Sequence, residues 1–147
     1  MPICDHVAFR VADLDRSVAF YERVLPGRVV SRKESTDRWR TKIAWIEPDG
    51  QPGFTLVLIQ PTRVRVLLRI LHALTPRFAR SYEHAGFACP SKEMLDERVR
   101  VAEEVGARVL VHPVFVDDET GTVAEVLDPD GNPIEWTYGQ SVRNARS

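Results

Sequence analysis

Cysteine, net charge and long apolar runs are all scarce in this chain of 147 residues. Its two cysteines, Cys4 and Cys89, are too few for a disulfide framework and form no Cys-x-x-Cys pair, so we expect reduced thiols in a cytoplasmic protein. The 20 basic and 21 acidic residues almost cancel, which leaves no electrostatic footprint for nucleic acid or a membrane surface. No window approaches the roughly 20 apolar residues of a membrane-spanning helix, and we expect no signal peptide. With 44% hydrophobic residues, the chain suits one domain with a buried core.

The chain does contain an internal duplication, with His6 and His84 at matching positions 78 residues apart. The stretches DHVAFRV and EHAGFAC each place a histidine after an acid and a phenylalanine three residues later. Each half also has a Pro-Asp-Gly turn, in EPDGQPG and DPDGNP, followed by a strand pattern, FTLVLIQ or IEWTY. We therefore interpret each half as β-α-β-β-β, which gives two modules in tandem and not a solenoid.

Each half predicts one amphipathic helix after its first strand. We expect Asp13 to cap the first helix and Gly27 to end it, and Ser91 and Gly106 to do the same for the second. The apolar residues at helical spacing are Leu14, Val18, Tyr21 and Leu25 in the first half and Leu95, Val99 and Ala102 in the second.

Alternation along the predicted strands assigns their faces. His6 and His84 each lie on the face that lacks the large apolar residues of its strand. In the last strand, Glu135 lies on the face away from Ile134 and Trp136. Three side chains that can bind metals thus lie on strand faces without large apolar residues. This suits a cavity on that side of the sheet and helices on the other.

The stretches HVAFRVADLDRSVAFYERVLPG, HAGFA and DPDGNPIEW resemble the vicinal oxygen chelate superfamily, which includes glyoxalase I, extradiol dioxygenases, fosfomycin-resistance enzymes and bleomycin-resistance proteins. The resemblance implies an α+β fold in which two tandem βαβββ modules form a curled mixed-sheet cup, usually around a divalent metal. It implies a single domain over 1–147, with modules at about 1–60 and 83–140, a linker helix at about 61–82 and a short tail. It also implies a homodimer, often with a cup built from modules of two chains.

In this superfamily four positions hold the metal, and the resemblance assigns three of them to His6, His84 and Glu135. Two imidazoles and one carboxylate leave coordination positions open for water, substrate or dioxygen, and they suit Fe(II), Mn(II) or Zn(II).

The fourth position falls on an apolar residue. Spacing from the histidines assigns it to Val57, and spacing from the Pro-Asp-Gly turns assigns it to Phe54. Neither side chain can bind a metal. Thr55 and Gln60 are polar and nearby, but each would require a register shift that reverses the faces of the strand.

Two further residues match substrate-facing positions of the superfamily. Arg10 corresponds to the arginine that holds a substrate carboxylate in glyoxalase I, the alternative being an arginine that pairs with an acid or reaches the surface. Glu125, ten residues before Glu135, could serve as a general base, the alternative being a surface glutamate on an edge strand. We interpret His72 and His112, which lie outside the repeat, as non-ligands.

We therefore expect a divalent-metal-dependent enzyme that acts on a small oxygen-rich molecule able to chelate the metal, of dioxygenase, lyase or isomerase, or resistance-transferase type. The apolar fourth position argues against a methylglyoxal isomerase, and Ala8 replaces a threonine typical of fosfomycin enzymes. The alternative is a metal-free, bleomycin-resistance-type protein that sequesters an aromatic drug, with Trp39 and Trp45 available for stacking.

The segment between the modules has no counterpart in the repeat. It predicts a basic amphipathic helix over about 63–75, with leucines on one stripe and most arginines off it. We interpret it as a linker helix that packs on the domain or across a dimer, with a lid, membrane binding or partner binding as alternatives.

Overall fold

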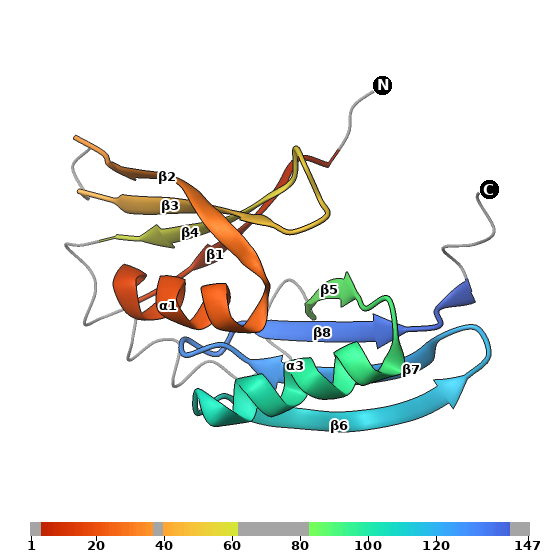
Figure 1. The fold of residues 1–147 in the computed structure, drawn as a ribbon. Coiled ribbons are helices and arrows are strands. Elements are labelled where there is room, and N and C mark those ends of the chain that lie inside the picture. Colours follow the sequence, from red (N-terminus) through yellow and green to blue (C-terminus); the bar gives the residue numbers. More distant parts are fainter. Residues whose placement is uncertain (1–3, 37–39, 62–82, 142–147) are drawn as a thin grey trace. The chain divides into compact units, whose positions relative to one another are not determined.

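The computed structural model of this chain describes residues 4–36, 40–61 and 83–141. It divides into two compact units, of which the first is Met1–Ser81 with the turn Pro129–Gly131, and the second is Tyr82–Asp128 with Asn132–Ser147 (Figure 1). The predicted helix at 63–75, His72 and Trp39 lie outside the described residues.

The first unit has the predicted β-α-β-β-β order. Its sheet order is β1-β4-β3-β2, with β1 and β4 parallel and the other neighbours antiparallel. The elements are β1 (His6–Arg10), α1 (Leu14–Val24), β2 (Gly27–Glu34), β3 (Lys42–Pro48) and β4 (Thr55–Gln60).

The second unit repeats this arrangement with sheet order β5-β8-β7-β6, in which β5 and β8 are parallel. The expected α+β fold with two βαβββ modules is therefore confirmed. The elements are β5 (Ala85–Ala88), α3 (Lys92–Glu104), β6 (Arg108–Asp117), β7 (Gly121–Leu127) and β8 (Pro133–Tyr138).

Both helices begin at the predicted caps. The Asp13 side chain accepts a hydrogen bond from the backbone N–H of Arg16 at 3.2 Å, and the Ser91 hydroxyl accepts one from the N–H of Met94 at 3.2 Å. Each bond satisfies one of the N–H groups that a helix start leaves without a partner.

The expected glycine stops hold for one helix only. Gly106 follows the end of α3 with φ of +78°, a conformation that glycine adopts without strain. Gly27 does not end α1, because that helix already ends at Val24. Gly27 instead begins β2, where a Cβ atom would collide with the carbonyl oxygen of Glu47 on β3.

Each helix packs its apolar stripe against one face of its own sheet. The fully or nearly fully buried residues of these two layers are Phe9, Leu14, Val18, Tyr21, Ala44, Ile46, Leu56 and Leu58 in the first unit, and Phe87, Leu95, Val99, Ala102, Ala124, Val126, Ile134 and Trp136 in the second. Burial of one such large side chain stabilises the fold by about 2 kcal/mol.

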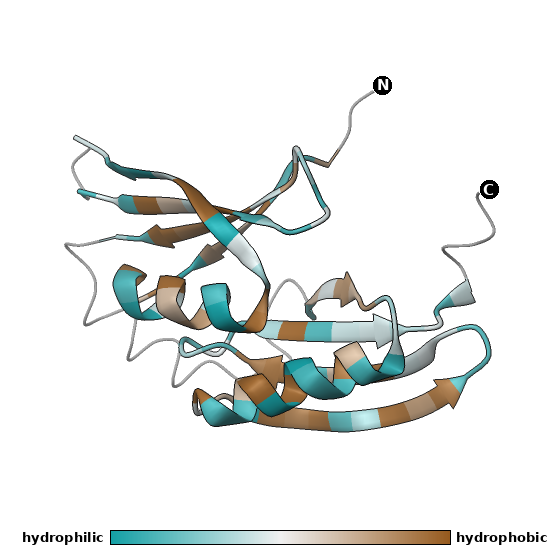
Figure 2. Cartoon of the chain, viewed as in Figure 1, coloured by the Kyte–Doolittle hydropathy of each residue, from teal (hydrophilic) through white to brown (hydrophobic). Residues whose placement is uncertain are grey.

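The opposite face of each sheet, here named the helix-distal face, carries the alternate residues of the strands. In β1, Phe9 is 3% exposed whereas its neighbours on the other face, Ala8 and Arg10, are exposed. In β8, Ile134 and Trp136 are buried whereas Glu135 between them is only partly buried, and Figure 2 shows one brown band followed by one teal band on this strand. The predicted alternation is confirmed in both units, and it directs the polar candidates to the helix-distal faces.

The turn Pro129–Gly131 belongs to the first unit, and its Asp130 side chain is bonded to α1. Asp130 accepts hydrogen bonds from Arg16 Nη2 at 2.8 Å and from the Ser17 hydroxyl at 3.1 Å, and its side chain is only 6% exposed. No helix among the described residues is long and apolar enough to cross a membrane.

Candidate functional site

His84 and Glu135 come together in the second unit. His84 lies immediately before β5, and β5 runs parallel to β8 with Gly86 opposite Glu135. The imidazole Nε2 lies 3.5 Å from the carboxylate Oε1, and the two side chains are 37% and 19% exposed. The sequence predicted that these two residues share a face, and the parallel pairing of their strands explains why they are also close.

Glu125 lies directly across from Glu135, on β7. Glu125 is 8% exposed, and β7 is an inner strand between β8 and β6, so the alternative of a surface glutamate on an edge strand is wrong. Like charges at directly opposed positions of a sheet destabilise it unless something neutralises them. The charge of Glu125 therefore favours a proton on Glu135, or a cation near it.

The environment of Glu135 raises the pKa of its carboxyl group. Burial raises the pKa of the Glu135 carboxyl, the nearby charge of Glu125 raises it further, and His84 opposes both. Gly86 adds no side chain beside the carboxylate; a Cβ atom there would lie 3.9 Å from Glu135 Oε1, at ordinary contact distance. A metal ion would reverse the cost of placing two carboxylates here.

His6 and Arg10 lie on the helix-distal face of the first unit, at the two ends of β1. His6 Nδ1 lies 2.7 Å from Asp5 Oδ1, and both side chains are more than half exposed. A carboxylate on one ring nitrogen of a histidine orients the ring and its other nitrogen, which is the usual arrangement behind a metal-binding imidazole.

The registers of the parallel strand pairs show which first-unit residue corresponds to Glu135 and so occupies the fourth metal-ligand position of the superfamily. Ala8 pairs with Val57 in the first unit, and Gly86 pairs with Glu135 in the second. Because Ala8 and Gly86 each follow a candidate histidine by two residues, Val57 is the counterpart of Glu135 and Phe54 is not.

Two polar residues near this position have other partners. Gln60 is 5% exposed, and its side-chain oxygen accepts a hydrogen bond from the N–H of Leu14, so it caps α1. Thr55 pairs with His6 across the parallel strands and holds no position equivalent to Glu135.

No group of three or more histidine, cysteine, aspartate or glutamate side chains is arranged to hold a metal ion within residues 4–36, 40–61 and 83–141. His84 and Glu135 are brought together, with Glu125 across from Glu135, while His6 has its contact with Asp5. His112 is exposed, with Nδ1 4.0 Å from Glu103 Oε1, as suits a surface histidine.

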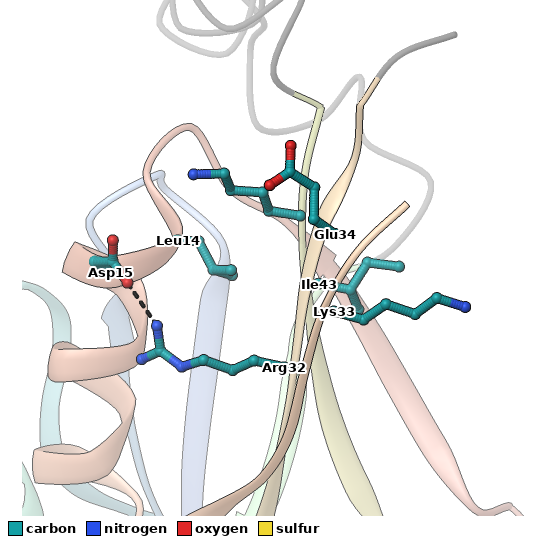
Figure 3. A pocket seen from close by; sticks show the side chains of 7 residues that line it. Leu14, Asp15, Arg32, Lys33, Glu34 and Ile43 are labelled. Atoms are coloured by element: carbon teal, nitrogen blue, oxygen red, sulfur yellow. Dashed lines mark hydrogen bonds and ion pairs between the residues drawn. The ribbon is translucent and has the colours of Figure 1, made fainter. Parts of the chain in front are cut away.

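The first unit also has a pocket of about 320 Å³ that the sequence did not indicate (Figure 3). It lies between the start of α1 and strands β2 and β3, and Arg32 Nη1 donates a hydrogen bond to Asp15 Oδ1 at 2.6 Å on its wall. The charged residues Arg32, Lys33 and Glu34 at the end of β2, together with Asp15 on α1, are the sequence feature that could have indicated this pocket. None of the candidate ligands lines this pocket.

A Pseudomonas aeruginosa protein, described only as "Uncharacterized protein PA2024", is 31% identical to this chain over 140 residues, which cover 95% of the chain and 90% of the relative. A glyoxylase/bleomycin resistance protein/dioxygenase domain from Frankia sp. EAN1pec superposes with a TM-score of 0.77 at 21% identity, covering 95% of this chain and 99% of that one. A mutant of the fosfomycin resistance protein FosX from Listeria monocytogenes, complexed with Mn(II) and 1S,2S-dihydroxypropylphosphonic acid, superposes with a TM-score of 0.69 at 14% identity, covering 100% and 99% of the two chains.

These structures share the fold that the strand orders and helix positions define. The model of the family described as "Glyoxalase/Bleomycin resistance protein/Dioxygenase superfamily" matches residues 3–136, nearly the whole of both modules. This chain belongs to the glyoxalase/bleomycin resistance protein/dioxygenase superfamily.

Proposed function

We propose that this protein is a divalent-metal-dependent enzyme that acts on a small oxygen-rich molecule able to chelate the metal. The observation that carries the proposal is the meeting of His84 and Glu135, with Glu125 across from Glu135, on one sheet face. A carboxylate close to an imidazole, with a second carboxylate across the strands, is chemically suited to a cation. Metal dependence also accords with the Mn(II) complex of the related FosX.

The proposed ligands are His84 and Glu135 of the second module and His6 of the first. The donor set fits a divalent metal such as Fe(II), Mn(II) or Zn(II), because it combines two neutral imidazoles with one carboxylate. Asp5 supports His6 by holding its Nδ1 at 2.7 Å, which leaves Nε2 as the donor atom. When bound, the metal would supply Lewis-acid stabilisation of negative charge on the substrate oxygens.

The other proposed roles belong to Glu125 and Arg10. Glu125 is a buried carboxylate beside the ligand Glu135, and we assign to it the proton transfer as general base. Arg10 is exposed at the far end of β1 from His6, where its guanidinium can bind a carboxylate or phosphate group of the substrate. We further propose that both modules act together as one domain, in a cytoplasmic homodimer.

Metal analysis tests the proposal. Protein purified without chelator, or dialysed against Mn(II), should hold the metal in stoichiometric amount. His84→Ala and Glu135→Ala should each weaken Mn(II) binding by about 100-fold or more, because each removes a directly bonded donor. His112→Ala, an exposed histidine outside the set, is the matched control and should bind as the unchanged protein does. Full retention of Mn(II) in both ligand variants would refute the assignment.

A second candidate function is metal-free sequestration of an aromatic drug, as in bleomycin-resistance proteins. The observation that favours it is the apolar first module, where Val57 takes the place of the Glu135 carboxylate. The same measurement separates the two candidates. A protein with neither native metal nor uptake of Mn(II), Fe(II) or Zn(II) would favour sequestration.

A further inference from the structure

The second unit exposes a run of apolar side chains near the end of β6. Val114, Phe115 and Val116 are 46%, 61% and 52% exposed, and Figure 2 shows this end of the strand in brown. No other exposed large apolar residues are consecutive within residues 4–36, 40–61 and 83–141. Single apolar residues are ordinary on a protein surface, whereas a contiguous run indicates a contact surface.

The run lies on an edge strand. β6 is the last strand in the sheet order β5-β8-β7-β6, so only one of its sides is paired with another described strand. Successive side chains of a strand point to opposite faces, so apolar groups flank this edge on both faces of the sheet. An exposed apolar edge strand is the part of a sheet at which a second chain most readily associates.

Two features of β6 limit how a second chain can associate with it. Pro113 has no backbone N–H to donate, and the register of β6 with β7 shifts at three places. These irregularities disfavour a continuous ladder of backbone hydrogen bonds with a further strand. Side-chain contacts, and not added strand pairing, should therefore provide most of the association energy.

The charges along β6 are complementary to those of a second copy of the same strand. Arg108 begins β6, Asp117 ends it and Asp118 follows directly, and all three residues are exposed. The strand thus has a basic end and an acidic end, with a mostly apolar part between them. Two copies that run antiparallel about a twofold axis place the basic end of each beside the acidic end of the other.

A twofold axis at Pro113 gives the register of such a pair. Arg108 and Asp118 are each five residues from Pro113, so they lie opposite each other. Val111 and Phe115 are each two residues from it and also face each other. Neither Arg108 nor Asp118 forms an ion pair within the parts of the chain that the structure describes, so each gains a partner of opposite charge in the pair.

We propose that the outer edge of β6 is the surface at which two copies of this chain associate. Phe115 lies in the apolar centre of this surface, and Arg108 of each copy faces Asp118 of the partner subunit. A contact of this kind uses the same patch on both chains and closes after two of them. The inference rests on the proposed homodimer and deepens it, because it names the surface that the two chains share.

Sedimentation equilibrium of the full chain tests the apolar centre. The unchanged protein should be a dimer at micromolar concentration, and Phe115→Asp should weaken the dimer by about tenfold or more, because it places a charge in the buried centre. Far-UV circular dichroism establishes that this variant is folded. Dimerisation of Phe115→Asp as tight as that of the unchanged protein would overturn the proposal.

Val30→Asp is the matched control. Val30 is 43% exposed on β2, which is the corresponding edge strand of the first unit. The same change of an exposed apolar residue to aspartate should here keep the dimer affinity within about twofold. Equal weakening by Val30→Asp and Phe115→Asp would overturn the assignment to β6.

Charge reversal tests the antiparallel arrangement. Arg108→Glu and Asp118→Lys should each weaken the dimer by about threefold, and the double variant should regain the affinity of the unchanged protein. Within one chain the two residues lie at opposite ends of β6, roughly 30 Å apart, so only contact between copies can produce this recovery. A double variant that dimerises no more tightly than the single variants would overturn the arrangement.

Oligomeric state and metal content separate this inference from the proposed function. A dimer that persists in Phe115→Asp would refute the β6 surface alone, whereas an unchanged protein that stays monomeric at millimolar concentration would refute the proposed homodimer as well. A dimer that depends on Phe115 but takes up no Mn(II) would refute the metalloenzyme and leave the β6 surface in place.

Discussion

The imidazole of His84 and the carboxylate of Glu135 lie 3.5 Å apart on the helix-distal face of the second unit. The parallel pairing of β5 with β8 produces this proximity, since it sets Gly86 beside Glu135 and carries the preceding histidine to the same end of the sheet. An imidazole and a carboxylate are donor types of a metal site. Without a metal, the ionised Glu135 carboxylate affects the stability of the folded protein.

We expect Glu135→Gln to stabilise the metal-free protein at pH 7. Burial raises the pKa of Glu135 above the ordinary value of 4.5. The folded state therefore binds this proton more tightly than the unfolded state, so the carboxyl group favours folding at low pH and disfavours it as the pH rises through the folded pKa. The gain from glutamine should be below about 1 kcal/mol, because the side chain is partly solvated.

Urea unfolding in the presence of EDTA, at pH 7 and near pH 3, measures this effect. The gain should disappear near pH 3, well below the ordinary value of 4.5, where the Glu135 carboxyl group of the unchanged protein is protonated in the folded and the unfolded state. Glu83→Gln, at an exposed position shortly before β5, should have little effect at either pH. A loss of stability at pH 7 in Glu135→Gln would contradict the raised pKa of Glu135.

Subunit mixing tests whether the proposed ligand set combines modules of two chains. If each site takes His6 from one chain and His84 and Glu135 from the other, a heterodimer of His6→Ala and His84→Ala chains has one intact site out of two. If each site lies within one chain, the same heterodimer has no intact site. If the homodimer shares its sites, mixing after reversible denaturation should recover part of the Mn(II) binding that each variant lacks alone. Neither variant homodimer, treated in the same way, should recover any.

Asp130 should matter more for stability than its counterpart Asp49 in the other Pro-Asp-Gly turn. The Asp130 side chain is 6% exposed and is bonded to Arg16 and Ser17. Asp130→Ala should cost about 2 kcal/mol of unfolding free energy, because it removes two hydrogen bonds to a buried carboxylate. Asp49 is exposed, so Asp49→Ala should cost less than about 0.5 kcal/mol in the same urea titration. Equal costs would contradict this contrast.

Cys4 and Cys89 should differ in reactivity. Burial raises the pKa of the Cys89 thiol, and the charge of Arg98 offsets this only in part, whereas Cys4 is exposed. Because the thiolate is the reactive form, iodoacetamide at pH 8 should modify Cys89 about tenfold more slowly than Cys4. Peptide mass mapping over time follows both sites in one sample, and faster modification of Cys89 would contradict the prediction.

Local features of the sequence were enough to predict both modules. Helix caps such as Asp13 and Ser91 act on N–H groups two or three residues away, so the neighbouring sequence is enough to predict them. Strand alternation is equally local, and it correctly placed Trp136 and Glu135 on opposite faces of β8. The duplicated histidine motif added the family resemblance that the family match then confirmed.

The sequence by itself thus determined the β-α-β-β-β modules, the faces of their strands and the types of ligand that those faces offer. Only the tertiary structure decided that Val57, and not Phe54, matches Glu135, and that Glu125 lies buried on an inner strand. The reason is that register and strand order arise from hydrogen bonds between segments far apart in the chain, where a shift of one residue reverses every face. Gln60 illustrates the same limit, since its bond to the start of α1 spans 46 residues.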